Sequence, residues 1–234
     1  PPQPEIEFFK LNAVDADYTQ NHTRVPDLSA DVRVKFPTEE YIGAYVSHGQ
    51  SKTVFVMKSS NRNKGKFDGT VLKINRKHDM EPAVMRQVEQ VTPKVLYECT
   101  GKDGNDEYHC WVTERCIPFD KLAVLQSTCD KNACALAACR CMTRAALCRL
   151  QLSDCHYYNF GVRISPSATE QEVVIIDVGS RGIAKAVPNK GETTRQCMQK
   201  LWKHSREEIE ASPHETHELW KGESTLEDIM RVLD

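Results

Sequence analysis

Five short segments between residues 40 and 116 constrain the fold of this chain more than any other feature of its sequence. They read EYIGAYVSHG, KTVFVMKSS, GTVLKI, KVLYECT and EYHCWVTERC, and they are rich in β-branched and aromatic residues. Such residues favour strands, and the intervening stretches NRNKGKFDG and GKDGND are typical of turns. The pattern predicts an antiparallel sheet, with one helix from HDMEPAVMRQVEQV between its third and fourth strands.

The chain changes character near residue 130. The stretch NACALAACRCMTRAALCRLQL holds no glycine or proline, which predicts a long buried helix. Two short strands, FGVRI and EVVIID, follow it, and the remaining residues have helical patterns. We therefore divide the 234 residues into an N-terminal extension with little periodicity (1–38), a strand-rich part (39–116) and a mainly helical part (117–234).

The composition argues against two classes of partner. Basic and acidic residues nearly balance, at 31 against 33, so no strong field favours nucleic acid or an anionic membrane surface. No apolar run reaches the length of a membrane span. Ten cysteines occur without any CxxC pair, which favours packing residues over a zinc site or disulfides and indicates a reducing compartment such as the cytoplasm. The oligomeric state leaves no mark on the sequence.

Two polar groups of residues stand out in the second half. Asp154, His156 and Asn159 fall within one loop segment, and Asp177 directly follows the apolar strand segment. An enzyme that phosphorylates a hydroxyl needs a carboxylate to accept the proton, and a carboxylate with an amide to hold Mg²⁺ on the nucleotide phosphates. The simpler interpretation of Asp177 is an acid that caps the end of a strand.

A lysine and a glutamate stand out in the first half. Strand alternation places Lys73 on the face opposite Leu72 and Ile74, and Glu81 opens the predicted helix eight residues later. A strand lysine is usually a solvated edge residue. Paired, Lys73 and Glu81 would form a clamp that orients phosphates. Glu89 is the weaker candidate for the partner, because it would lie two turns further from the helix start.

The order of these elements resembles the protein-kinase-like superfamily. VLKI looks like that family's Val-Ala-Ile-Lys strand, SDCHYYN like its catalytic loop and DVG like its Asp-Phe-Gly triplet. The resemblance covers roughly residues 39 to 185. It implies an α+β, two-lobed protein-kinase-like fold, with an antiparallel β N-lobe that carries one helix and a mainly helical C-lobe. It also implies that ATP and Mg²⁺ bind in the cleft between these lobes.

The resemblance assigns a role to each candidate residue. The catalytic set is Asp154 as the base, Lys73 with Glu81 as the phosphate clamp, and His156 near the γ-phosphate. Asn159 and Asp177 would bind Mg²⁺. The nucleotide-binding set comprises Gly43, Gly49, Gln50, Ser51 and Lys73, together with the backbone from Glu114 to Cys116, which would contact adenine.

Departures from the family refine the expected function. Leu152 and Ser153 replace the usual His-Arg pair, and no Ala-Pro-Glu follows the triplet. His156 fits the Asp-x-His-x-x-Asn pattern of aminoglycoside- and choline-kinase-like enzymes. Because only about 55 residues follow the triplet, we expect a compact atypical kinase that phosphorylates a protein hydroxyl. The alternatives are a small-molecule kinase and a catalytically inactive kinase-like binding module.

Overall fold

The computed structural model describes part of the chain and divides it into two units. The described residues are 4–10, 31–48, 52–62, 65–118, 140–141, 144–145, 148, 150–152, 159–163, 172–178, 183–185 and 196. Unit 1 comprises Pro1–Pro82 and Lys94–Arg115, and unit 2 comprises Ala83–Pro93 and Cys116–Asp234.

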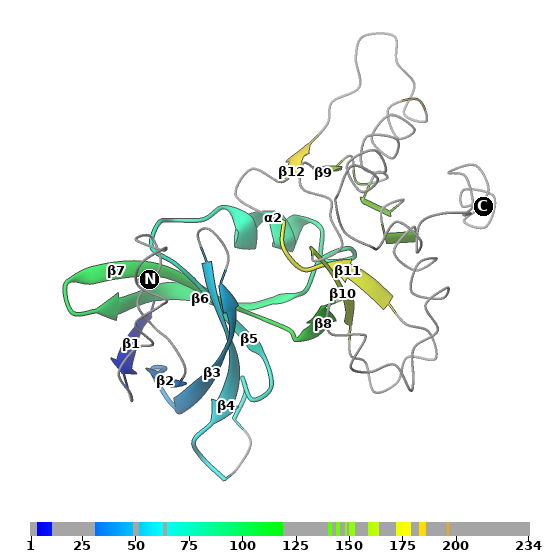
Figure 1. The fold of residues 1–234 in the computed structure, drawn as a ribbon. Helices are drawn as coiled ribbons and strands as arrows, with labels where there is room; N and C mark the ends of the chain where they lie inside the picture. Colours follow the sequence, from blue (N-terminus) through cyan, green and yellow to red (C-terminus); the bar gives the residue numbers. More distant parts are fainter. Residues whose placement is uncertain are drawn as a thin grey trace. The chain divides into compact units, whose positions relative to one another are not determined.

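Unit 1 contains a closed β-barrel (Figure 1). The strands, in their order around the barrel, are β1 (Glu5–Lys10), β2 (Asp31–Lys35), β3 (Glu40–His48), β4 (Lys52–Ser59), β5 (Val71–Asn75), β7 (Asp106–Thr113) and β6 (Val95–Asp103). Neighbouring strands pair antiparallel except at the closure, where β1 runs parallel to β6. Closure removes the unpaired edges that an open sheet would expose.

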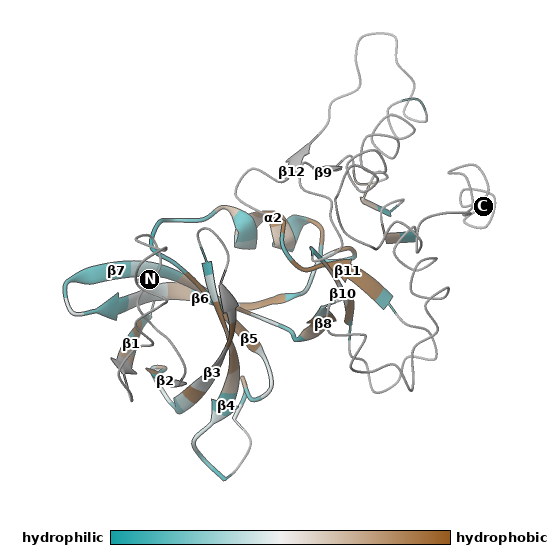
Figure 2. Cartoon of the chain, in the orientation of Figure 1, coloured by the Kyte–Doolittle hydropathy of each residue, from teal (hydrophilic) through white to brown (hydrophobic). Residues whose placement is uncertain are grey.

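Alternation of side chains along the strands builds the core of this barrel. Phe55, Leu72, Ile74 and Val112 are fully buried and belong to one hydrophobic cluster inside the barrel. Lys73 lies between Leu72 and Ile74 in sequence, so it faces the opposite side of the strand, as the sequence predicted. Figure 2 shows the β6–β7 hairpin as hydrophilic toward its turn and hydrophobic toward its other end.

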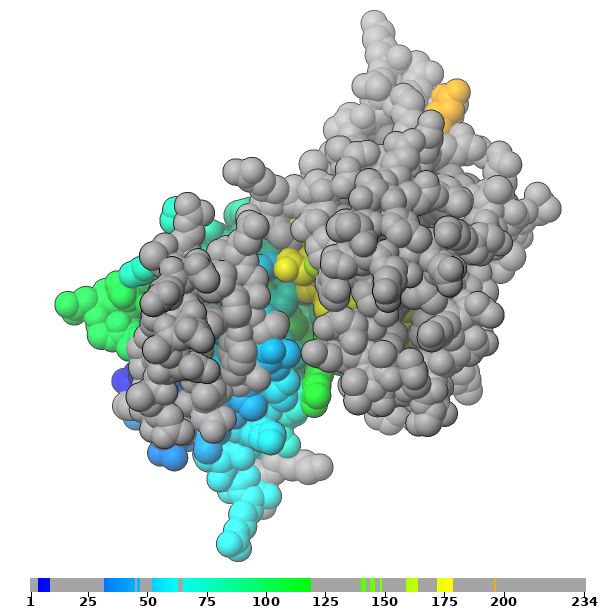
Figure 3. All heavy atoms as spheres, in the orientation of Figure 1, coloured from blue at the N-terminus to red at the C-terminus, as the bar shows by residue number. Residues whose placement is uncertain are grey.

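Two turns lie at the periphery of the barrel. Gly104 joins β6 to β7 with a φ of 64°, a left-handed conformation that glycine adopts without strain. This is the hairpin turn that GKDGND predicted. Residues 60 to 62, which follow β4, are exposed, and this part of the chain, coloured cyan, protrudes at the bottom of Figure 3.

The predicted helix is present but shorter than its sequence pattern. Helix α2 spans Glu81–Gln87, whereas the pattern extended over residues 78 to 91. Beyond it, the N–H groups of Val88 and Val91 donate to the carbonyls three residues earlier, which is a turn geometry. Met80, counted in the apolar pattern, is 55% exposed. No described helix is long and apolar enough to cross a membrane.

Unit 2 contains two small sheets among its described residues. The first has the order β11 (Glu172–Ile175), β10 (Phe160–Arg163) and β8 (Cys116–Pro118), and the second pairs β12 (Ile183–Lys185) with β9 (Leu150–Leu152). Figure 2 shows β11 as mostly hydrophobic. Arg163 anchors this region because its guanidinium donates to the carbonyls of Thr92 (2.8 Å) and Glu89 (3.1 Å) and pairs with Glu172 (2.8 Å).

The prediction of a two-lobed protein-kinase-like fold with a mainly helical C-lobe is wrong. The described residues are mostly β, unit 1 holds a closed seven-strand barrel, and α2 is the single helix with defined bounds among them. Leu150–Leu152, expected to end the long helix, forms β9 instead. Strand pairing with β12 supplies its backbone hydrogen bonds and outweighs the helical preference of an Ala- and Leu-rich stretch.

The closure of the barrel depends on residues that the sequence left irregular. β1 and β2 both lie within residues 1–38, which are rich in proline and show little periodicity. Locally, however, Ile6 and Phe8 alternate with Glu5 and Glu7, and Val32 and Val34 alternate with charged residues. These four apolar side chains pack into the barrel core. Two such short runs are weak signals. β2 pairs with the nearby β3, but β1 gains its hydrogen bonds from β2, which follows after 20 residues, and from β6, which begins at Val95.

Candidate functional site

The candidate site lies on the outer face of the barrel, across β4, β5 and β7. The β4–β5 register pairs Lys52 with Asn75, and the β5–β7 register pairs Lys73 with Trp111 and Asn75 with His109. Directly paired residues, and diagonal neighbours two positions apart, project from the same face of a sheet. The strand pairing alone therefore places all five side chains on one face, opposite the apolar core.

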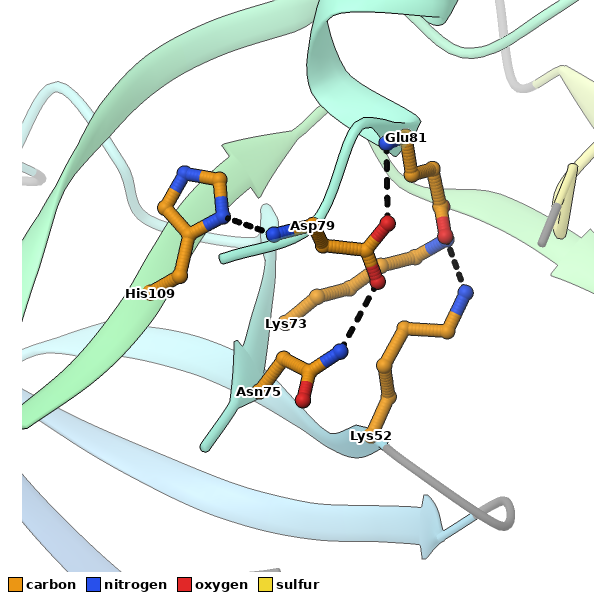
Figure 4. A network of polar contacts seen from close by, with 6 residues as sticks. All are labelled: Lys52, Lys73, Asn75, Asp79, Glu81 and His109. Atoms are coloured by element: carbon orange, nitrogen blue, oxygen red, sulfur yellow. Dashed lines mark hydrogen bonds and ion pairs between the residues drawn. The ribbon is translucent and has the colours of Figure 1, made fainter. Parts of the chain in front are cut away.

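Glu81, the first residue of α2, binds two lysines of this face. Its Oε1 accepts a hydrogen bond from Lys73 Nζ at 2.5 Å, and its Oε2 accepts one from Lys52 Nζ (Figure 4). The side chains of Lys73, Lys52 and Glu81 are 9%, 8% and 0% exposed. The contact between Lys73 and Glu81 that the sequence predicted is present, whereas Glu89 is exposed and lies beyond α2. The phosphate-clamp role of the pair stays a prediction.

Asp79 fixes the position of Glu81. Its Oδ1 accepts a hydrogen bond from the Glu81 N–H at 2.9 Å, and its Oδ2 accepts one from Asn75 Nδ2 at 2.9 Å. Asn75 in turn accepts a hydrogen bond from the Lys77 N–H at 3.1 Å. Asp79 is buried. A buried carboxylate with both oxygens bonded ties the start of α2 to β5 and limits the positions that Glu81 can adopt.

His109 supports the same segment from β7. Its Nδ1 accepts a hydrogen bond from the backbone N–H of Asp79 at 2.9 Å, so the ring proton of the neutral imidazole lies on Nε2. Nε2 then donates to Glu98 Oε1, also at 2.9 Å. The ring of His78 stacks on that of His109 with centroids 4.6 Å apart. His109 therefore serves as an acceptor that holds the Asp79 backbone.

Most of the described cysteines are buried and serve packing. Cys99, Cys110 and Cys141 are buried thiols, Cys116 is buried in β8, and the half-buried Cys148 accepts a hydrogen bond from Gln90 Nε2. Burial raises the pKa of the Cys141 thiol to about 12, and burial together with the neighbouring Cys99 raises the pKa of Cys110 well above its ordinary value. Both thiols are protonated at neutral pH and are therefore poor nucleophiles. No group of three or more histidine, cysteine, aspartate or glutamate side chains among the described residues could hold a metal ion.

Asn159 and Asp177 lie at one end of the β10–β11 ladder in unit 2. The pairing of Phe160 with Ile175 continues one step further, where the Ile176 N–H donates to the Asn159 carbonyl at 2.7 Å. Asn159 is buried and Asp177 is half-buried. An amide and a carboxylate offer oxygen ligands of the kind that Mg²⁺ prefers, and the binding of Mg²⁺ by these two residues stays a prediction. Asp154 and His156 lie outside the described residues.

The predicted nucleotide-binding residues give a mixed picture. Gly43 is buried within β3, and a Cβ atom there would lie 3.2 Å from the Phe55 Cβ, so close packing accounts for this glycine. Glu114 donates its N–H to the Lys94 carbonyl at 3.0 Å, so this N–H is engaged within unit 1, and the contact of the segment with adenine stays a prediction. Cys116 belongs to β8, where it pairs with Arg163. Gly49, Gln50 and Ser51 lie outside the described residues.

Sequence reasoning missed Lys52 as the second partner of Glu81, and it missed the supporting residues Asn75, Asp79 and His109. The alternation of KTVFVM places Lys52 on the outer face, because Thr53, Phe55 and Met57 are buried. The alternation pattern therefore predicts the face of the sheet on which Lys52 lies, but it does not predict that Glu81 is its partner. Lys52 and Glu81 are 29 residues apart, and only the β4–β5 register brings them together.

Comparisons with known proteins match the chain to solved structures but to no protein family. No family model matches the chain, and no curated protein matches it. Among solved structures, the chain is similar to "WaaP in complex with acyl carrier protein", with 15% sequence identity over 81% of this chain and 82% of that chain. The TM-score is 0.44. Similarity at this level establishes neither a fold nor an activity for this chain.

Proposed function

We propose that this chain is an ATP-dependent phosphotransferase that transfers a phosphoryl group to a hydroxyl on a protein. The contact between Lys73 and Glu81 carries the proposal. A lysine that would ordinarily be solvated is instead buried, and a carboxylate eight residues away binds its ammonium. Such a pair holds the ammonium in a fixed position, which suits contact with the phosphates of a nucleotide. These side chains and the order of the sequence motifs support the proposal, and a shared fold does not.

The proposed reaction uses a small number of groups. Lys73 binds the phosphates of ATP, and Glu81 holds its ammonium in place. Asn159 and Asp177 would hold Mg²⁺, which would supply positive charge to offset the charge of the phosphates. Asp154 accepts the proton of the acceptor hydroxyl while the oxygen of that hydroxyl bonds to the γ-phosphorus of ATP. The bond from that phosphorus to the β-phosphate oxygen breaks, and ADP leaves with the electron pair.

One observation favours a second candidate function. His156 within Asp154-x-His156-x-x-Asn159 matches the loop pattern of aminoglycoside- and choline-kinase-like enzymes, which favours a small-molecule alcohol as the acceptor. The departures at Leu152 and Ser153 favour a third candidate, a catalytically inactive module. The three candidates differ in whether ATP is consumed and in what becomes labelled.

Incubation with γ-labelled ATP, Mg²⁺ and a cell lysate separates these candidates. A protein kinase labels protein bands beyond its own autophosphorylation, and a small-molecule kinase labels only the low-molecular-weight fraction. An inactive module labels neither. Asp177→Ala serves as the control, because it should abolish the labelling without disturbing the barrel of unit 1. Equal labelling by the parent and by Asp177→Ala would contradict the proposed metal site.

A further inference from the structure

Lys52 occupies a position that neither the sequence motifs nor the proposed reaction assigns. It is the first residue of β4, and the register pairs it with Asn75 while Val54 pairs with Lys73. Lys52 and Lys73 are therefore diagonal neighbours on the same face of the sheet. Like charges at neighbouring positions of a sheet repel. Glu81 offsets this repulsion, because each of its carboxylate oxygens accepts a hydrogen bond from one of the two ammonium groups.

The burial of this arrangement argues against a purely stabilising role. All three side chains are less than a tenth exposed, and desolvation of charged groups often costs as much as their attraction returns. Replacement of a whole buried ion network by apolar residues is often neutral for stability.

We propose that Lys52 is a second phosphate-binding lysine, and that Glu81 holds Lys52 and Lys73 side by side to bind neighbouring phosphate groups of a nucleoside di- or triphosphate. This inference rests on the proposed function and deepens it. One carboxylate sets the spacing of both ammonium groups, because its two oxygens share one carbon atom. Two adjacent positive charges match two adjacent phosphates, whereas a nucleoside without phosphates offers them nothing to bind. Lys52 therefore confers selectivity for the polyphosphate chain.

Isothermal titration calorimetry with ATP, ADP and adenosine, each with Mg²⁺, tests this assignment. Lys52→Met keeps a similar side-chain length and removes the charge, and Lys58→Met is the matched control at an exposed position of the same strand. Loss of a hydrogen bond to a charged group predicts that Lys52→Met weakens ATP and ADP binding roughly 10- to 100-fold and leaves adenosine binding unchanged. Lys52→Arg, which keeps the charge, should recover part of the affinity for ATP.

The possible outcomes separate this inference from the proposed function. A parent protein that binds none of the three ligands contradicts the proposed function, and the role of Lys52 with it. If the parent binds ATP and Lys73→Met weakens that binding while Lys52→Met does not, only the inference about Lys52 is overturned. Equal losses for ATP and adenosine also overturn it, because they indicate a structural effect. If circular dichroism shows that Lys52→Met is unfolded, the comparison of ATP with adenosine for Lys52→Arg and Lys52→Gln decides.

Discussion

Replacement of Glu81 by glutamine perturbs the buried ion network without changing its shape. The amide oxygen of the new side chain accepts a hydrogen bond from one lysine, but its N–H₂ group faces the ammonium of the other. Because Glu81 is fully buried and both lysines are nearly so, solvent screens this mismatch poorly. Loss of one charge from a buried pair costs about 3–5 kcal/mol. We expect a value near the lower end, about 3 kcal/mol, because one lysine keeps a neutral acceptor.

Urea denaturation followed by far-UV circular dichroism measures this loss as a lower transition midpoint at an unchanged slope. Glu89→Gln is the matched control, because Glu89 is exposed and lies outside α2. It should change the free energy of unfolding by less than about 0.5 kcal/mol. Adding Lys52→Met to Glu81→Gln should recover about 1 kcal/mol, because the glutamine then faces a single lysine. Equal stabilities of Glu81→Gln and Glu89→Gln would refute the ion network.

Three further predictions concern the barrel and its outer face. Gly101→Ala should destabilise the protein by about 1–3 kcal/mol, because the added Cβ overlaps the Phe8 ring across the β1–β6 closure, and Phe8→Leu should relieve part of that loss in urea titrations. Asp79→Ala should lower the free energy of unfolding by about 1–2 kcal/mol, because the hydrogen bonds at the start of α2 are lost. Asn75→Ala should destabilise the Asp79→Ala variant less than it destabilises the parent, because the two side chains share a hydrogen bond; additive losses would contradict this coupling. Burial raises the pKa of Tyr108 from 10.0 to about 12. The unfolded state therefore loses the phenol proton first, and the free energy of unfolding falls as the pH rises from 10 to 12. Tyr108→Phe should show a shallower fall in the urea midpoint over that range, and a fall identical to that of the parent would contradict the pKa shift.

Local patterns predicted the elements that carry the site. The alternation around Lys73 gave its face correctly, because an apolar residue on each side of it fixes the register of a short strand. The position of Glu81 at the start of the predicted helix correctly indicated it as the partner of Lys73. The β6–β7 hairpin followed from a glycine-containing turn between two strand-like segments. Each of these inferences depends on residues that are close together in the sequence.

Features that depend on distant residues were not predictable in the same way. β1 gains its hydrogen bonds from β2, which follows after 20 residues, and from β6, far along the chain, and neither β1 nor β2 indicates by its sequence that the sheet closes on itself. The partnership of Lys52 with Glu81 likewise requires the β4–β5 register. The expectation of a mainly helical second half failed because composition favoured a helix at Leu150–Leu152 while pairing with β12 decided for a strand. Propensity is a weak guide where tertiary pairing is available.

Thermal denaturation of the parent and of Lys73→Ala, with and without Mg²⁺·ATP, tests the central claim most directly. A ligand that binds only the folded state raises the melting temperature by mass action, with a free energy of about 2.7 kcal/mol at 100 times its dissociation constant. The proposed role of Lys73 predicts a clear upward shift with Mg²⁺·ATP for the parent and a much smaller one for Lys73→Ala, while adenosine at the same concentration shifts both proteins equally. Equal shifts of both proteins with Mg²⁺·ATP, or no shift for the parent, would contradict it.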